Sequence, residues 1–273
     1  MTKKKNHWLG PILLTIVLII LGIATFAYLT FHPIISFNPA DVPPITANPI
    51  DANRLFAVSK FRSDDGHDYS VNAWDGEICR SMKHYLNWNQ NQVNNQPVRS
   101  QPSPDHPNIN VYAPFDGAIV DIEQEHTPIG HQVHIASNKN PSYFVILFHI
   151  DLLPGLKVGS RVSSGERIAT VGPMDGIDVA YEALMMTGKT VYLSIFQYMT
   201  PQAFAPYAKL GFRPDDFILS RAQADALGYG CNGEQFVHPM SFYTSGAYMT
   251  EGQVLLGKNP YQYLYNQQNQ QSY

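Results

Sequence analysis

Hydrophobic and polar positions divide the chain into one long apolar run and a series of short segments with the alternation of β-strands. The apolar run covers residues 8–31 and contains no charged residue. A helix of this length reaches roughly 36 Å at about 1.5 Å per residue, which is enough to cross a hydrocarbon core of about 30 Å. The pattern therefore predicts one transmembrane helix near the N-terminus.

The charges on either side of this run set its predicted orientation. Lys3, Lys4 and Lys5 precede it, whereas residues 32–53 contain no Lys or Arg. Residues 1–7 are therefore predicted to be cytoplasmic and the remainder extracytoplasmic. A cleaved signal peptide is the alternative, but the run is longer than the apolar part of such peptides, and no small-x-small cleavage site follows it.

The next segment, residues 32–53, holds five prolines and few large apolar groups in any period. Such a composition is typical of a stiff, extended stalk. The sequence therefore predicts a stalk between the membrane and a domain that begins near residue 54.

Strand patterns fill the middle of the chain. Asp116-Gly117 precedes an alternating segment over residues 118–123, which predicts a hairpin turn entering a half-buried strand. Residues 142–150 are almost continuously apolar, as in a central strand that is covered on both faces. Residues 191–196 alternate again. Together these patterns predict a mainly β domain.

Helix signals follow the strands. Thr200 can cap a helix that starts at Pro201, and Ser220 with Gln223 forms a capping-box pattern that ends at Gly228. These helices are predicted to pack outside the sheet, in a helical and irregular extension over residues 201–264. The polar residues 265–273 are predicted to be a disordered tail.

Composition excludes some classes of partner and site. The net charge of −4, with acids and bases interspersed, provides no basic face for a nucleic acid. The two cysteines, Cys79 and Cys231, both lie in the predicted extracytoplasmic part, where one disulfide is allowed, although spacing alone leaves the pairing open. Without a CxxC pair they are too few for a structural zinc knot.

Three motifs in order resemble the M23, or LytM/lysostaphin-type, peptidases. They are "VYAPFDGAIV", His149 in "ILFHID", and the glycine-punctuated "GSRVSSGERIATVG". The resemblance covers about a third of the chain and implies an antiparallel β barrel-sandwich, a duplicated hybrid motif, within residues 54–200. The predicted fold class is thus mainly β with peripheral helices, preceded by one transmembrane helix.

The resemblance also implies a zinc site, held in that family by an H-x-x-x-D motif and the second His of an H-x-H motif. The first motif falls on His84, with Trp88 in place of the Asp, and the second on Tyr192 and Ser194. One of three ligands remains, together with His149, the strand-end His that assists the attacking water in the family. Relatives with eroded zinc sites regulate cell-wall hydrolases, so the first hypothesis is a non-catalytic, membrane-anchored domain that binds a cell-envelope glycan, peptide or protein in a groove containing His84, Trp88, Tyr192 and Ser194.

A second hypothesis is an active zinc endopeptidase acting on cell-wall peptides. Its ligands would be His67, Asp68 and His84, with His149 as a catalytic residue, and it requires these side chains to converge on one ion. The expected cofactor is therefore none, or Zn²⁺. The third hypothesis, a membrane-fusion type adaptor, requires a long helical hairpin that the sequence does not contain.

Other polar side chains are predicted to lie on the surface. His126, His131 and His134 bracket a loop and a strand and are expected to be exposed. Glu123 and Glu125 are expected on the polar face of the same hairpin, where an acid/base pair is a less common use of such residues.

Overall fold

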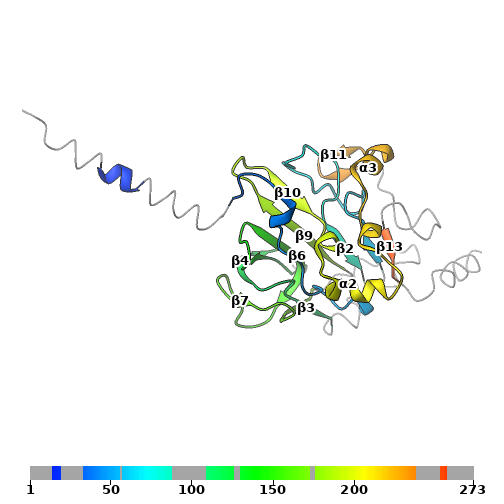
Figure 1. The fold of residues 1–273 in the computed structure, drawn as a ribbon, viewed down its shortest axis with the longest axis horizontal. Coiled ribbons are helices and arrows are strands. Elements are labelled where there is room, and N and C mark those ends of the chain that lie inside the picture. Colours follow the sequence, from blue (N-terminus) through cyan, green and yellow to red (C-terminus); the bar gives the residue numbers. More distant parts are fainter. Residues whose placement is uncertain are drawn as a thin grey trace, which may run out of the picture.

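The computed structural model describes residues 14–19, 33–55, 57–87, 109–125, 130–172, 176–237 and 253–256. These residues form an 11-stranded antiparallel sheet and a separate two-stranded ribbon, with short helices beside them (Figure 1). The predicted mainly β class with peripheral helices is confirmed. The strands are β1 (Ala57–Ser59), β2 (His84–Asn87), β3 (Asn110–Tyr112), β4 (Gly117–Gln124), β5 (His131–Ser137), β6 (Tyr143–Leu152), β7 (Arg161–Val162), β8 (Arg167–Val171), β9 (Gly176–Leu184), β10 (Thr190–Leu193), β11 (Cys231–Asn232), β12 (Gln235–Phe236) and β13 (Gln253–Leu255).

The strand order along the sheet is β13-β1-β2-β9-β6-β5-β4-β7, with β10 paired to β9, and β8 paired to both β6 and β3. Strand β6 lies between β5 and β9, as its continuous apolar sequence predicts. Because side chains alternate along a strand, β4, β5, β6 and β9 contribute to two different surfaces. One surface is the core and the other is an open groove.

The core face collects β-branched, aliphatic and aromatic side chains from the central strands. Val133 on β5, Leu147 on β6 and Val179 on β9 are paired across the sheet and are fully buried or nearly so. The residues one position away point to the opposite face, where His134 pairs with Ile146 and Ile146 with Ala180. This opposite face carries the polar groups described below.

Strand β4 departs from the predicted simple alternation. The register of β4 against β5 shifts between Ile119 and Asp121, which leaves Val120 as the extra residue of a β-bulge. Ile119 is fully buried in the core, while Val120 and Asp121 both line the groove. A bulge of this kind turns a side chain toward the other face.

The Asp116-Gly117 pair does not join two paired strands, so the predicted hairpin is wrong. Strand β3 pairs with β8, and β4 pairs with β5 and β7. Gly117 serves a close approach instead, because a Cβ atom there would lie 2.3 Å from the carbonyl oxygen of Ala136. The Asp116 side chain accepts a hydrogen bond from the backbone N–H of Ser164.

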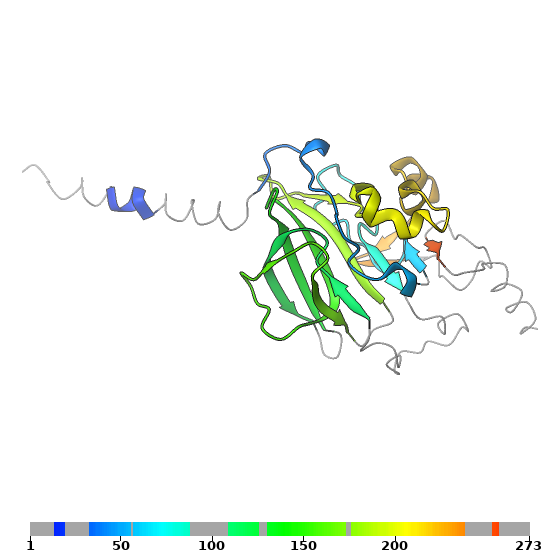
Figure 2. The same ribbon diagram turned by 60° about the horizontal axis from the view of Figure 1, so that its bottom comes forward.

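Both predicted helices are present: α2 (Pro201–Ala208) with Thr200 as its N-cap, and α3 (Arg221–Leu227) with the Ser220 and Gln223 capping box. They lie at the end of the molecule occupied by β1, β2 and β13, away from β4 and β7 (Figures 1 and 2). Four short 3-10 helices are also present in the domain: Pro39–Asp41, Ala52–Arg54, Phe196–Tyr198 and Pro214–Phe217.

The predicted Pro-rich stalk is instead part of the domain. Ile45 and Ile50 are fully buried and form isolated bridges to Met199 and Val111. The backbone carbonyl of Pro43 accepts a hydrogen bond from the hydroxyl of Tyr181 at 2.6 Å. The apolar residues between the prolines therefore pack into the core. In so short a segment, their spacing has no period that would indicate this burial.

Two predicted segments lie outside the described residues. These are residues 1–7, which were predicted to be cytoplasmic, and the predicted tail at 265–273. Of the predicted transmembrane residues 8–31, the structure describes only 14–19, which are helical. Within the described ranges, no helix combines the length and apolar character that a membrane crossing requires.

The two cysteines are joined. A disulfide links Cys79, in the loop before β2, to Cys231 at the start of β11, with Cα atoms 5.6 Å apart and a sequence separation of 152. The pairing that the sequence left open is thus formed, and it ties the C-terminal ribbon to the sheet.

Candidate functional site

His149 lies near the end of β6 in an unusual backbone conformation. Its φ angle is +63°, a region that residues other than glycine seldom adopt. The carboxylate of Glu125 accepts hydrogen bonds from the His149 backbone N–H at 3.2 Å and from Nδ1 at 2.8 Å. The His149 carbonyl in turn accepts a 2.7 Å bond from the N–H of Gly172. These contacts hold a strained residue in place, as is common at functional positions.

The His149 ring is one member of a row of polar groups that crosses the sheet. Its Nε2 lies 3.4 Å from Oδ2 of Asp178 on β9, and the same carboxylate accepts a 2.7 Å hydrogen bond from Nζ of Lys83. Lys83 Nζ is also 3.1 Å from Nε2 of His67. We call this row the ion-pair chain: Glu125, His149, Asp178, Lys83 and His67.

Lys83 is the most deeply buried cation of the ion-pair chain. Its side chain is 2% exposed, and its ammonium lies 4.8, 5.0 and 4.5 Å from the ring centroids of Tyr69, Tyr85 and Phe148. A buried ammonium is tolerated only when it is paired, and here a carboxylate and three aromatic faces surround it. The interior of the site therefore already contains a fixed positive charge.

Positive and negative charges alternate around His149 and Asp178 at neutral pH. Burial acts to lower the pKa of His149, but the carboxylates of Asp178 and Glu125 outweigh it and raise the pKa to about 9. Burial acts to raise the pKa of Asp178, and Lys83 and His149 overcome it, so that this pKa is lowered. His149 is thus an imidazolium ion between two carboxylates and has no free lone pair with which to activate a water molecule.

His84 does not belong to this site. It follows Lys83 directly, so its side chain points to the opposite, core face of the sheet, where it is fully buried. Its Nδ1 is 2.8 Å from the carbonyl oxygen of Ser59, and its Nε2 is 2.8 Å from Oγ of Ser194. Burial lowers the pKa of His84 to about 4. His84 is therefore a neutral residue of the core, and the Ser194 hydroxyl beside it also lies in the core.

The predicted groove of His84, Trp88, Tyr192 and Ser194 is therefore not formed as expected. The structure describes three of these four residues, and of the three only Tyr192 points to the open side of the sheet. Its ring centroid is 5.7 Å from that of Tyr69, and its hydroxyl donates a hydrogen bond to the carbonyl of Val71. Trp88 lies outside the described residues.

The predicted zinc ligands His67, Asp68 and His84 do not converge either. The carboxylate of Asp68 accepts hydrogen bonds from the Ser70 backbone N–H and hydroxyl and from the backbone N–H of Arg80, which hold it within its own loop. His67 contacts Lys83, and His84 lies behind the sheet. Among the described residues, the group with metal-ligand proximity is a different one, formed by Asp121, Glu123 and His134.

Sequence reasoning missed Lys83, Asp178 and Glu125. The H-x-H motif of the family was assigned to Tyr192 on β10 and to Ser194 directly after it. Strand β9 instead pairs with β6, which carries His149, and Asp178 of β9 contacts the His149 ring. The alternation of "GIDVAYEAL" after Gly172 is a signal that could have indicated this strand. Glu125 was expected to be exposed, but its side chain is 8% exposed because it closes on His149.

A groove lies alongside the ion-pair chain on the open face of the sheet, with a cavity volume of about 810 Å³. Burial raises the pKa of Glu182 in its floor to about 7, although Tyr69 and Lys83 act against this rise. The lining combines aromatic rings, carboxyl groups and amides and contains no Lys or Arg among the described residues. It consists of Tyr69, Ala118, Val120, Asp121, Glu123, Gln132, His134, Ala136, Ser137, Asn138, Pro141, Phe144, Ile146, Glu182, Leu184 and Thr190.

Comparisons with known proteins give no match by sequence, neither to a protein family nor to a curated protein. Solved structures do resemble the chain. A chain of the SpoIIQ–SpoIIIAH pore-forming complex is 13% identical with a TM-score of 0.38, and the match covers 58% of this chain and 92% of that one.

A zinc-containing peptidase from Vibrio cholerae is 16% identical with a TM-score of 0.31, and the match covers 55% of this chain but 39% of the peptidase. Lysostaphin is 14% identical with a TM-score of 0.30, and the match covers 66% of this chain and 61% of lysostaphin. The likeness to all three is one of fold alone. Lysostaphin, whose peptidase type the motifs resemble, is thus among the similar solved structures.

Proposed function

We propose that this protein is a membrane-anchored, extracytoplasmic, M23 peptidase-like domain that binds a peptide of the cell envelope without cleaving it. The observation that carries the proposal is Lys83. Its ammonium ion is bound to Asp178 within the same polar row as His149, the residue that the resemblance assigns to water activation. Two neighbouring positive charges, Lys83 and protonated His149, oppose a zinc ion there.

The groove supplies the binding surface of the proposal. Tyr69 and Phe144 offer apolar ring faces, while Gln132 and Asn138 offer amides that can pair with a peptide backbone. Glu182 and the absence of basic groups in the described lining favour a ligand with an amino group or a basic side chain. Cell-wall peptides carry such groups on a short, extended chain.

The binding test uses the purified full chain and soluble peptide fragments of cell wall, titrated by calorimetry. We expect saturable binding, and intact peptide by mass spectrometry after prolonged incubation. Glu182→Gln and Phe144→Ala should weaken binding by about tenfold or more, because each removes a central contact of the groove. Glu234→Gln makes the same charge change on an exposed residue outside the groove and should have no effect.

Either of two results would contradict the proposal. One is the absence of binding under conditions where the chain is folded. The other is progressive cleavage of the peptide that His149→Gln abolishes, which would identify an active hydrolase. Membrane anchoring is tested separately by deleting residues 8–31, which should move the protein from the membrane fraction to the soluble fraction.

A further inference from the structure

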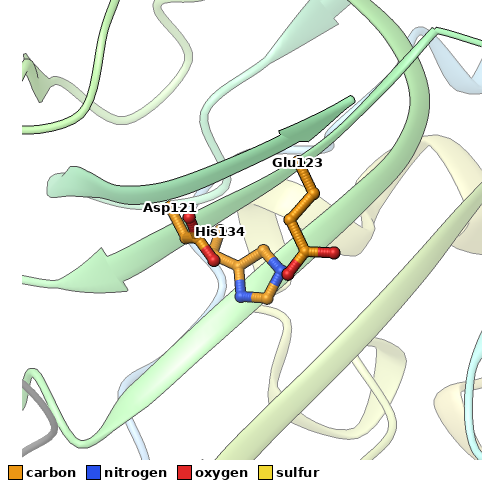
Figure 3. A group of neighbouring side chains, drawn as sticks. All are labelled: Asp121, Glu123 and His134. Atoms are coloured by element: carbon orange, nitrogen blue, oxygen red, sulfur yellow. The ribbon is translucent and has the colours of Figure 1, made fainter. Parts of the chain in front are cut away.

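A second polar cluster lies in the groove on strands that the ion-pair chain does not use. Asp121 and Glu123 project from β4, and His134 projects from β5. One ligand atom from each of the three lies within 4.8 Å of the other two. Figure 3 shows the His134 ring between the two carboxyl groups.

The local fold explains why these side chains meet. The β-bulge at Val120 sets Asp121 directly opposite His134, and Glu123 follows two residues later on the same face. All three therefore project from paired strands rather than from loops, which restricts their movement. One Asp121 carboxylate oxygen accepts the Ile122 backbone N–H at 2.9 Å, and the other is left for a ligand.

The contacts of His134 indicate a missing partner. Its Nε2 is buried but makes no hydrogen bond within the described part of the chain, which is unfavourable for a polar atom. The ring stacks on Phe144 at a centroid distance of 5.8 Å and an interplanar angle of 13°, so its orientation is set by packing. The sequence-based expectation that His134 is exposed is therefore wrong.

The two carboxylates of the cluster also lack a paired cation among the described side chains. Neither Asp121 nor Glu123 forms an ion pair with a Lys or Arg of the described ranges. An imidazole nitrogen without a hydrogen-bond partner, next to two carboxylates, is a combination of groups that binds metals.

We propose that Asp121, Glu123 and His134 bind one divalent transition-metal ion, with Zn²⁺ as the preferred species. One imidazole nitrogen and two carboxylate oxygens match the ligands of zinc, whose bonds are about 2.0–2.2 Å long. Glu123 is exposed and can close the remaining distance by rotation of its side chain. Three protein ligands leave coordination positions that face the groove.

This site differs in place from the one that the family resemblance implies. It uses β4 and β5, whereas that resemblance points to His149 and to the strands around it. The inference does not depend on peptide binding, because metal affinity is measured without a peptide. A bound ion would, however, offer the groove a contact for a ligand carboxylate.

The test is calorimetric titration of Zn²⁺ into the full chain, prepared without a histidine tag and stripped of metal with a chelator. We expect about one ion per chain. Glu123→Gln and His134→Gln should each weaken binding by more than about tenfold, since even outer partners of a metal ligand contribute 10–100-fold. His131→Gln, on the same strand, should bind zinc as the wild type does.

Unfolding curves of each variant show that the loss is not a loss of folding, and Glu123→Gln is the safest variant because Glu123 is exposed. The proposal is overturned if the folded wild type binds no zinc. It is equally overturned if zinc remains bound to both Glu123→Gln and His134→Gln, or if His149→Gln alone abolishes binding.

Discussion

The charge of His149 should make the stability of the domain depend on pH in the alkaline range. Its pKa is about 9 in the folded protein and about 6.5 in an unfolded chain. A raised pKa means that the folded state binds the proton more tightly. The stabilisation is therefore fully present below pH 6.5 and is lost as the pH rises through about 9.

The size of the effect follows from this difference. The side chain of His149 is 19% exposed, so that solvent screens its contacts with Glu125 and Asp178 only in part. The shift from about 6.5 to about 9 corresponds to about 3 kcal/mol of unfolding free energy. Lysine and tyrosine side chains also titrate at high pH, so a matched variant is needed.

The assay is urea unfolding of the wild type and of His149→Gln at pH 6, 7.5 and 9.5, with the disulfide intact. The wild type should be more stable at pH 6, and its advantage should shrink by about 3 kcal/mol by pH 9.5. An NMR titration should show the His149 ring with a pKa near 9 and the His84 ring with a pKa near 4. A His149 ring that titrates near 6.5, or an advantage that does not change with pH, would refute the reasoning.

Two further perturbations test the ion-pair chain and the disulfide. Lys83→Met should lower the unfolding free energy by about 3–5 kcal/mol, because it leaves the Asp178 carboxylate buried without its cation. Adding Asp178→Asn to Lys83→Met should restore part of this stability. Equal stability of the single and the double variant would argue against a buried pair. Replacing Cys79 and Cys231 together with Ser should cost roughly 5 kcal/mol by the chain-entropy relation for a 152-residue separation, measured by urea unfolding, and an unchanged midpoint would contradict it.

The regular elements were predictable because their signals are local. Strand β6 is marked by its continuous apolar residues, and α3 by Ser220, Gln223 and Gly228, each of which acts on its own helix end. Residues 32–53 were predicted to form a stalk because their few apolar residues have no period. Their burial depends on partners such as Met199 that are far away in sequence.

The site was harder to predict because it depends on which face each residue occupies. Lys83 and His84 are neighbours in sequence, yet they lie on opposite sides of the sheet and only Lys83 joins the ion-pair chain. The bulge at Val120 changes the face of Asp121, and the positive φ of His149 turns its ring toward Glu125. Neither irregularity has a signal in the pattern of hydrophobic and polar residues.

The packing of residues 33–55 determines how far the domain can reach. A free tether of the 22 residues that were expected to form a stalk would extend roughly 70 Å as a polyproline helix and would let the groove sweep a wide volume. Ile34 is instead hydrogen-bonded to Leu184 and Met186, next to the β9–β10 turn. If the proposed anchor ends at residue 31, the packed segment leaves almost no free chain between the anchor and the domain, and the groove would reach only the layer of the envelope next to the membrane.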